Sequence, residues 1–76
     1  MSERLPRVTP DEAIRALGRA GWKPLRQHGS HLHLHHEDRP GVVTVARHAG
    51  TILKPKTLKS ILKQAGLSTE EFKEFL

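Results

Sequence analysis

Two neighbouring segments decide the fold class of this 76-residue sequence: His31-Leu32-His33-Leu34-His35-His36 and, after a short polar stretch, Val42-Val43-Thr44-Val45. In the first segment leucine alternates with histidine, and a period of two residues is typical of a strand with one buried face. The leucines are therefore expected to face a core, and the alternating His31, His33 and His35 to line the opposite side. The second segment is β-branched, which favours a strand. A Pro-Gly pair between the segments indicates a turn, so they predict two adjacent antiparallel strands.

A third strand is predicted just upstream, over residues 22–28. This segment contains Pro24, which cannot donate a hydrogen bond to a central ladder and so indicates an edge or irregular strand. Gly29 and Ser30 follow it and are typical of a tight turn. Because the connections are short, the three strands are expected to form an antiparallel meander.

Helical patterns flank the strands on both sides. Residues 9–12 carry the sequence signature of a capping box with proline at the first helical position, and the apolar spacing that follows predicts a helix over 10–20. A second apolar stripe predicts a helix over 56–65, and a further capping box at 68–71 predicts a short terminal helix. A glycine follows each of the first two helices as a stop signal.

The predicted class is therefore α+β, in the order α-β-β-β-α(-α), with a three-stranded antiparallel sheet packed on two helices. Residues 1–8 show no clear period and are predicted to be an N-terminal tail, and residues 9–76 a single domain. The expected core is apolar and drawn from the first two helices and the three strands: Ile14, Leu17, Trp22, Leu32, Leu34, Val43, Val45, Leu58, Ile61 and Leu62.

The composition excludes several classes of protein. The chain has no cysteine, so a disulfide scaffold, a cysteine-ligated zinc site and a cysteine nucleophile are excluded. No apolar run approaches the roughly 18–20 residues of a membrane span, and no signal-peptide pattern follows Met1, so a cytoplasmic protein without a membrane is expected. A domain this small is not expected to enclose a deep cavity, so an enzyme of this size would need an open groove suited to a polymer.

The positive charge is concentrated in one segment. Residues 47–63 contain no acidic residue, and their five cations equal the whole formal net charge of +5: Arg47, Lys54, Lys56, Lys59 and Lys63. Three of the lysines share one face of the predicted second helix, and two lie at its start, where the helix dipole adds partial positive charge. A solvated face would explain this pattern, but so would a polyanion-binding surface, and the clustering favours nucleic acid as a partner. Because aromatic residues are scarce, recognition of the backbone is expected rather than stacking on bases.

Five of the six histidines lie within residues 28–36, and three interpretations are open. His31, His33 and His35 could be metal ligands on one strand face. Alternatively, one histidine is a general acid or base, since the unperturbed imidazole pKa of about 6.5 suits proton transfer near neutral pH. His31 is then the best placed, because it follows the Gly29-Ser30 turn directly. In the third interpretation all five are simply the solvent face of a strand.

Several motifs carry a resemblance to a known family. They are Gly21-Trp22, then 26–31 (Arg-Gln-His-Gly-Ser-His), 43–45 (Val-Thr-Val) with 48–50 (His-Ala-Gly), 53–58 (Leu-Lys-Pro-Lys-Thr-Leu) and 61–67 (Ile-Leu-Lys-Gln-Ala-Gly-Leu). In this combination and spacing the sequence resembles the HicA toxins of bacterial toxin–antitoxin pairs, from about residue 11 to 76. The resemblance implies a fold like that of double-stranded-RNA-binding domains and a ribosome-independent mRNA interferase. It also implies that the essential histidine is His31, in Gly29-Ser30-His31, and that a HicB antitoxin covers this site.

These implications suggest a mechanism without a metal or other cofactor. His31 would accept the proton of the RNA 2′-OH, and His28, His33 and His48 are the candidates for the acid that protonates the leaving oxygen. The five cations of residues 47–63 would bind the phosphates of mRNA or another single-stranded RNA, with Arg47 neutralising developing charge. The alternative is a non-catalytic RNA-binding module that uses the same basic helix.

Overall fold

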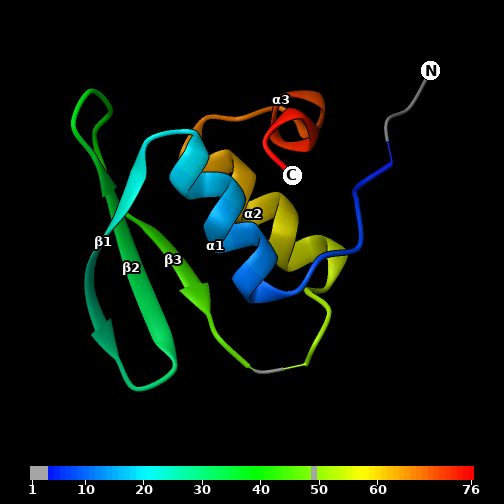
Figure 1. The fold of residues 1–76 in the computed structure, drawn as a ribbon, viewed down its shortest axis with the longest axis horizontal. Coiled ribbons are helices and arrows are strands. Elements are labelled where there is room, and N and C mark those ends of the chain that lie inside the picture. Colours follow the sequence, from blue (N-terminus) through cyan, green and yellow to red (C-terminus); the bar gives the residue numbers. More distant parts are fainter. Residues whose placement is uncertain (1–3, 49) are drawn as a thin grey trace.

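The computed structural model describes residues 4–48 and 50–76 (Figure 1). The elements follow in the order α1 (Pro10–Arg19), β1 (Trp22–His28), β2 (His31–His36), β3 (Val43–Ala46), α2 (Pro55–Ala65) and α3 (Thr69–Glu74). The strands form one antiparallel sheet in the order β1-β2-β3, so the predicted α+β class and the meander are confirmed. Residues 1–3 of the predicted tail and Ala49 of the 48–50 motif lie outside the described residues.

Capping boxes begin both α1 and α3, as the sequence predicted. At α1 the Thr9 hydroxyl accepts the Glu12 backbone N–H at 3.2 Å, and the Glu12 carboxylate accepts the Thr9 N–H at 2.8 Å. Ser68 and Glu71 repeat the arrangement at α3. In each box the backbone N–H of the cap residue, and then its hydroxyl, hold the pKa of the glutamate below its ordinary value. The boxes thereby place two ionised carboxylates at helix N-termini, where they are favourable.

Helix α2 ends where its glycine predicted. Gly66 has φ +70°, a left-handed conformation that glycine adopts without the steric penalty of a Cβ. The Arg39 guanidinium lies 3.4 Å from the carbonyl oxygens of both Ala65 and Gly66. A cation at a helix C-terminus complements the helix dipole, so this contact ties the β2–β3 connection to the end of α2.

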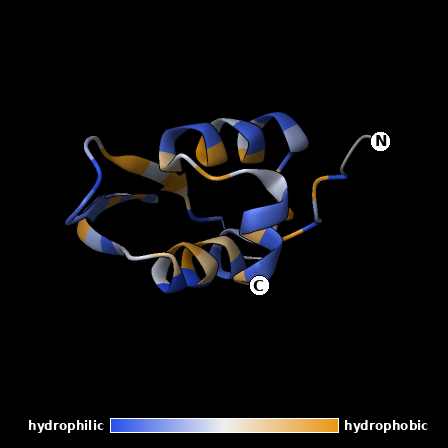
Figure 2. Cartoon of the chain, turned by 90° about the horizontal axis from the view of Figure 1, so that it is seen from above, coloured by the Kyte–Doolittle hydropathy of each residue, from blue (hydrophilic) through white to orange (hydrophobic). Residues whose placement is uncertain are grey.

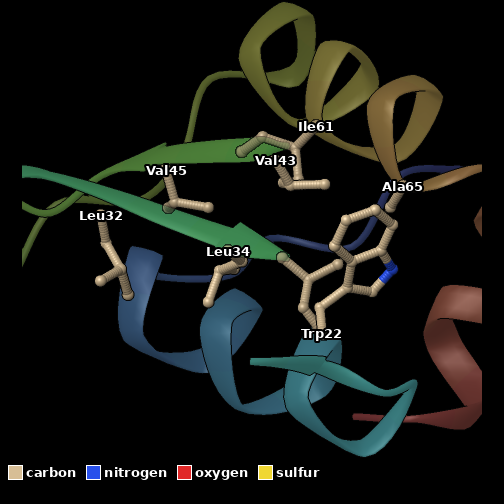
Figure 3. Packing of buried hydrophobic residues seen from close by; sticks show 8 residues of the cluster. Trp22, Leu32, Leu34, Val43, Val45, Ile61 and Ala65 are labelled. Atoms are coloured by element: carbon tan, nitrogen blue, oxygen red, sulfur yellow. The ribbon is translucent and has the colours of Figure 1, made fainter. Parts of the chain in front are cut away.

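One face of the sheet carries the main core. Leu32 pairs with Val45 and Leu34 with Val43, and these four side chains pack with Trp22 against residues of α1 and α2. Figure 3 shows the Trp22 ring pointing toward Ala65 of α2. The hydrophobic residues of the two longer helices lie mainly on their inner sides (Figure 2). Every predicted core residue is buried except Ile14, which is partly buried against the same cluster.

A second cluster joins α1, α2 and α3 to the N-terminal segment. It contains Leu58, Leu62 and Phe72 together with Val8, which is 4% exposed although the sequence analysis placed it in the tail. The Val8 carbonyl accepts the Leu53 N–H at 2.8 Å, so the end of that segment is held against the β3–α2 connection. The sequence did not predict this contact, because neither Val8 nor Leu53 belongs to a helical or strand pattern. Among the described residues, no helix is long and apolar enough to cross a bilayer.

Gly21 and the imidazole ring of His36 form the junction between α1 and the sheet. Gly21 has φ +101°, and the His36 ring lies directly against it and edge-on to Trp22, with ring centroids 5.3 Å apart. The Asp38 N–H donates to His36 Nδ1 at 3.0 Å, so the ring proton is on Nε2, which donates to the Ala20 carbonyl at 3.1 Å. His36 therefore fastens the open end of the β1–β2 hairpin to the end of α1.

Candidate active site

The tight turn between β1 and β2 is fixed by a left-handed glycine and two hydrogen bonds. Gly29 has φ +57°, and its carbonyl accepts an N–H from the Gln27 side chain at 2.9 Å. The Ser30 carbonyl accepts the Arg47 backbone N–H at 2.6 Å, which extends the ladder of β3 to the turn. Because these contacts fix the turn, the residues on either side of it are held directly opposite each other.

Those residues are His28 and His31, which pair across the two strands. Both are exposed. Directly opposite residues of an antiparallel pair have Cβ atoms about 4.5–5.5 Å apart, so the two imidazoles share one small region of surface. The structure thus brings together the histidine predicted to be essential and one of its three candidate assistants.

His28 lies on this face because of a bulge. The register of β1 against β2 shifts between Pro24 and Arg26, and the extra residue, Leu25, is 51% exposed. Without the bulge, strict alternation from the buried Trp22 would turn His28 toward the core. The extra residue reverses the alternation, so that His28 joins His31 on the outer face.

A second assistant, His33, is held by neighbours on the same face. Its Nδ1 lies 2.9 Å from the hydroxyl oxygen of Thr44 on β3, and its ring meets the His28 ring edge-on at 5.9 Å between centroids. The chain His28–His33–Thr44 therefore crosses all three strands. The contact with Thr44 was not predicted, although the cross-strand pairing of residues 33 and 44 follows once the register is known.

The third assistant, His48, is not part of this group. It lines an open cavity of about 610 Å³ between the start of α1, Gln27 and Arg47, and His31 does not line it. Beside it the Arg47 guanidinium contacts the Asp11 carboxylate at 3.1 Å and the Gln27 side-chain oxygen at 3.3 Å. Arg47 is thus linked to the turn through its backbone, while its charge is paired with α1.

The lysines of α2 are exposed, as predicted, but they are not grouped around His31. Lys54 is the N-cap residue of α2 and makes no side-chain cap bond, and no acidic residue occupies the first turn. Lys56, Lys59 and Lys63 are exposed along the helix whose other side is buried in the core. The start of α2 lies away from the β1–β2 turn, at the other end of the β3–α2 connection (Figure 1).

Sequence reasoning missed two cations on the outer face of the sheet. Lys23 pairs with His35 and Arg26 with His33, so both lie on the same face as the histidines. Strict alternation without the bulge would place these two residues on opposite faces of the sheet. Among the described residues, no group of three or more histidine or carboxylate side chains is placed to hold a metal ion, so His31, His33 and His35 do not form the ligand set considered above.

The sequence matches a known family model over most of its length. The family model described as the HicA toxin of bacterial toxin–antitoxin systems matches residues 10–67, from the start of α1 to just past α2. The matched region contains the β1–β2 turn, both exposed histidines beside it and all the lysines of α2. No curated protein matches the sequence.

Proposed function

The chain belongs to the HicA family of toxins from bacterial toxin–antitoxin systems, and from this premise we propose that it is a ribosome-independent mRNA interferase, an endoribonuclease that cuts single-stranded RNA. The observation that carries the proposal is the exposed pair His28–His31 on either side of a fixed turn. When the 2′-OH of RNA attacks the adjacent phosphorus, one group must accept a proton and another must donate one. Two exposed histidines on one region of the surface can supply both groups to a polymer.

In the proposed reaction His31, in its neutral form, accepts the proton of the 2′-OH. The 2′-oxygen attacks the adjacent phosphorus, the bond from phosphorus to the 5′-oxygen breaks, and the products are a 2′,3′-cyclic phosphate and a 5′-hydroxyl. A second group must supply the proton that the 5′-oxygen takes up, because one imidazole cannot be base and acid in the same step. No metal ion is required for the proton transfers.

We assign the acid to His28. It is exposed and directly opposite His31, so the two rings can address the two oxygens on either side of one phosphorus. His33 already shares its Nδ1 with Thr44, which suits a role in holding the His28 ring. His48 lines a cavity beside α1 that neither His28 nor His31 lines, and it is the least suited of the three.

The cations of residues 47–63 are proposed to hold the RNA on one side of the cleaved bond. From the turn the path along the β3–α2 connection passes Arg47 and reaches Lys54, Lys56, Lys59 and Lys63. Arg47 must exchange its contact with Asp11 for a phosphate to neutralise developing charge there. That exchange costs little, because an exposed ion pair is typically worth about 0–1 kcal/mol.

A toxin of this family has an antitoxin partner, and we propose that the partner is of the HicB type and covers the His28–His31 pair. Covering two exposed histidines on a flat face requires no cavity, only a complementary surface.

The test is cleavage of a long single-stranded RNA by the wild-type protein and by His31→Ala, with and without EDTA. The proposal expects cutting that survives EDTA, is absent in the variant, and stops when the 2′-OH at a mapped cleavage site is replaced by hydrogen. Binding by both proteins with cleavage by neither would instead support the non-catalytic RNA-binding module. Loss of cutting in EDTA that added Mg²⁺ restores would contradict the metal-independent mechanism.

A further inference from the structure

We propose that the uncovered face of the sheet binds single-stranded RNA by stacking bases on histidine and arginine side chains. This open face comprises six residues of β1 and β2 that point away from the core: Lys23, Arg26, His28, His31, His33 and His35. The inference rests on the proposed function, since it names the surface by which RNA reaches the His28–His31 pair.

The open face is free of helices and of negative charge. Both α1 and α2 pack on the opposite face, with Leu32, Leu34, Val43 and Val45. The three strands contain no aspartate or glutamate. Within residues 4–48 and 50–76, Lys23 and Arg26 have neither an ion-pair partner nor a side-chain hydrogen bond, and both are exposed. A polyanion therefore meets cations there without displacing a carboxylate.

The face also supplies planar groups in unusual number. Single-stranded RNA is recognised by unstacked bases that stack on aromatic rings, histidine included, or on arginine guanidinium planes. The larger rings of this chain cannot serve, because Trp22 is 1% exposed, Phe72 is fully buried and Phe75 is partly buried in the second cluster. Four imidazoles and one guanidinium, from two adjacent strands, are the planar groups that remain on the open face.

The histidines are partly ordered in advance of binding. His33 is held by the Thr44 hydroxyl and by the edge of the His28 ring, and His35 lies beside Lys23 on the neighbouring strand, half-buried. A platform whose rings are already restrained loses less side-chain entropy when a base stacks on it. On the open face we therefore infer stacking of bases, beside the backbone recognition expected at the cations of residues 47–63.

The experiment measures binding of a fluorescent oligoadenylate that is 2′-O-methylated throughout, so that attack by a 2′-OH is impossible. An abasic oligonucleotide of equal length is the matched probe. The variants are His35→Ala, Arg26→Lys, which keeps the charge but loses the planar group, and Lys73→Ala, which removes a charge on α3 and serves as control. Neither His35 nor Arg26 belongs to the proposed catalytic pair, and thermal unfolding checks that each variant is folded.

Stacking of one base typically changes affinity about fivefold to a hundredfold. His35→Ala and Arg26→Lys are each expected to weaken binding of oligoadenylate at least about fivefold and of the abasic probe less than twofold, with Lys73→Ala close to wild type. Equal losses for both probes would overturn stacking in favour of charge alone. Unchanged RNA binding in both variants would overturn the inference, and if antitoxin binding were then impaired, the face would be a protein interface.

Failure of the inference is distinguishable from failure of the proposed function. The binding assay needs no cleavage, so a protein that stacks bases but cuts no RNA supports the open face and refutes the nuclease. If RNA cleavage requires His31 but not His35 or Arg26, and the His35→Ala and Arg26→Lys variants bind RNA as wild type does, the nuclease is supported and base stacking on the open face is refuted.

Discussion

Replacement of Gly21 by alanine is expected to destabilise the hairpin that carries the proposed site. A Cβ at this position would lie 2.5 Å from Nε2 of His36 and 3.0 Å from its Cδ2, both inside van der Waals contact. The backbone there has φ +101°, which residues with a Cβ rarely adopt. The His36 ring must therefore move, and with it the contacts that it makes to Ala20 and Trp22.

The magnitude follows from those contacts. Backbone strain of this kind costs about 1–3 kcal/mol. Loss of the hydrogen bond from His36 to the Ala20 carbonyl costs about 0.5–1.5 kcal/mol, and loss of the edge-on ring contact about as much. Alanine restricts the unfolded chain and returns about 0.4–1 kcal/mol. The net destabilisation is thus roughly 1–5.6 kcal/mol, out of a total of about 4–11 kcal/mol for a domain of this length.

The assay is urea and thermal unfolding followed by circular dichroism, for Gly21→Ala in the wild-type and His36→Ala backgrounds. In the wild-type background the melting temperature is expected to fall by about 4–8 °C for each kcal/mol of that destabilisation. In the His36→Ala background the clash is absent, so only the backbone strain remains and the cost of Gly21→Ala should fall by about 1–3 kcal/mol. Equal costs in the two backgrounds would refute the contact between Gly21 and His36, and a stabilising Gly21→Ala would refute the backbone argument as well.

Three other predictions concern pH, salt and the leaving group. The pKa of Glu12 is lowered in the folded state, so its carboxylate stabilises the fold above the ordinary glutamate pKa of about 4.3, and this stability is lost as the pH falls through the lowered value. Glu12→Gln should therefore be less stable than wild type at pH 7 but equally stable near pH 2, as measured by urea titration at both pH values. A difference in stability that does not depend on pH would contradict this prediction. Lys59→Ala should reduce the slope of log binding constant against log salt by about 0.7 for single-stranded RNA, while an unchanged slope would exclude a phosphate contact. His28→Ala should slow cleavage about 10²- to 10⁴-fold, and a substrate with sulfur in place of the 5′-oxygen should restore the rate because a thiolate leaves unprotonated. His31→Ala should gain nothing from that substrate; rescue of His31→Ala instead would reverse the two assignments.

Local patterns in the sequence were sufficient for the elements themselves. The capping residues Thr9 and Ser68, the stop at Gly66 and the alternation over 31–36 each act within a few residues, so the helices and strands agree with prediction to within a residue or two. The burial of Leu32 and Leu34 and the outward position of His31 follow from the two-residue period alone. The position of His31 after an exposed turn was likewise legible from Gly29 and Ser30.

The tertiary structure decided which residues accompany His31. The bulge at Leu25 reverses the alternation of β1, and a single extra residue moves every later side chain to the other face, so the sequence period alone could not assign Arg26 or His28. The burial of Val8 and the pairing of Arg47 with Asp11 join segments more than thirty residues apart, and such contacts leave no local pattern. The sequence by itself determined the elements and the candidate base, because those depend on nearest neighbours along the chain. Only the fold decided which side chains of β1 lie on the outer face, that His28 lies opposite His31, and that the lysines of α2 lie apart from this pair. These features depend on strand register and on packing between elements that are distant in the sequence.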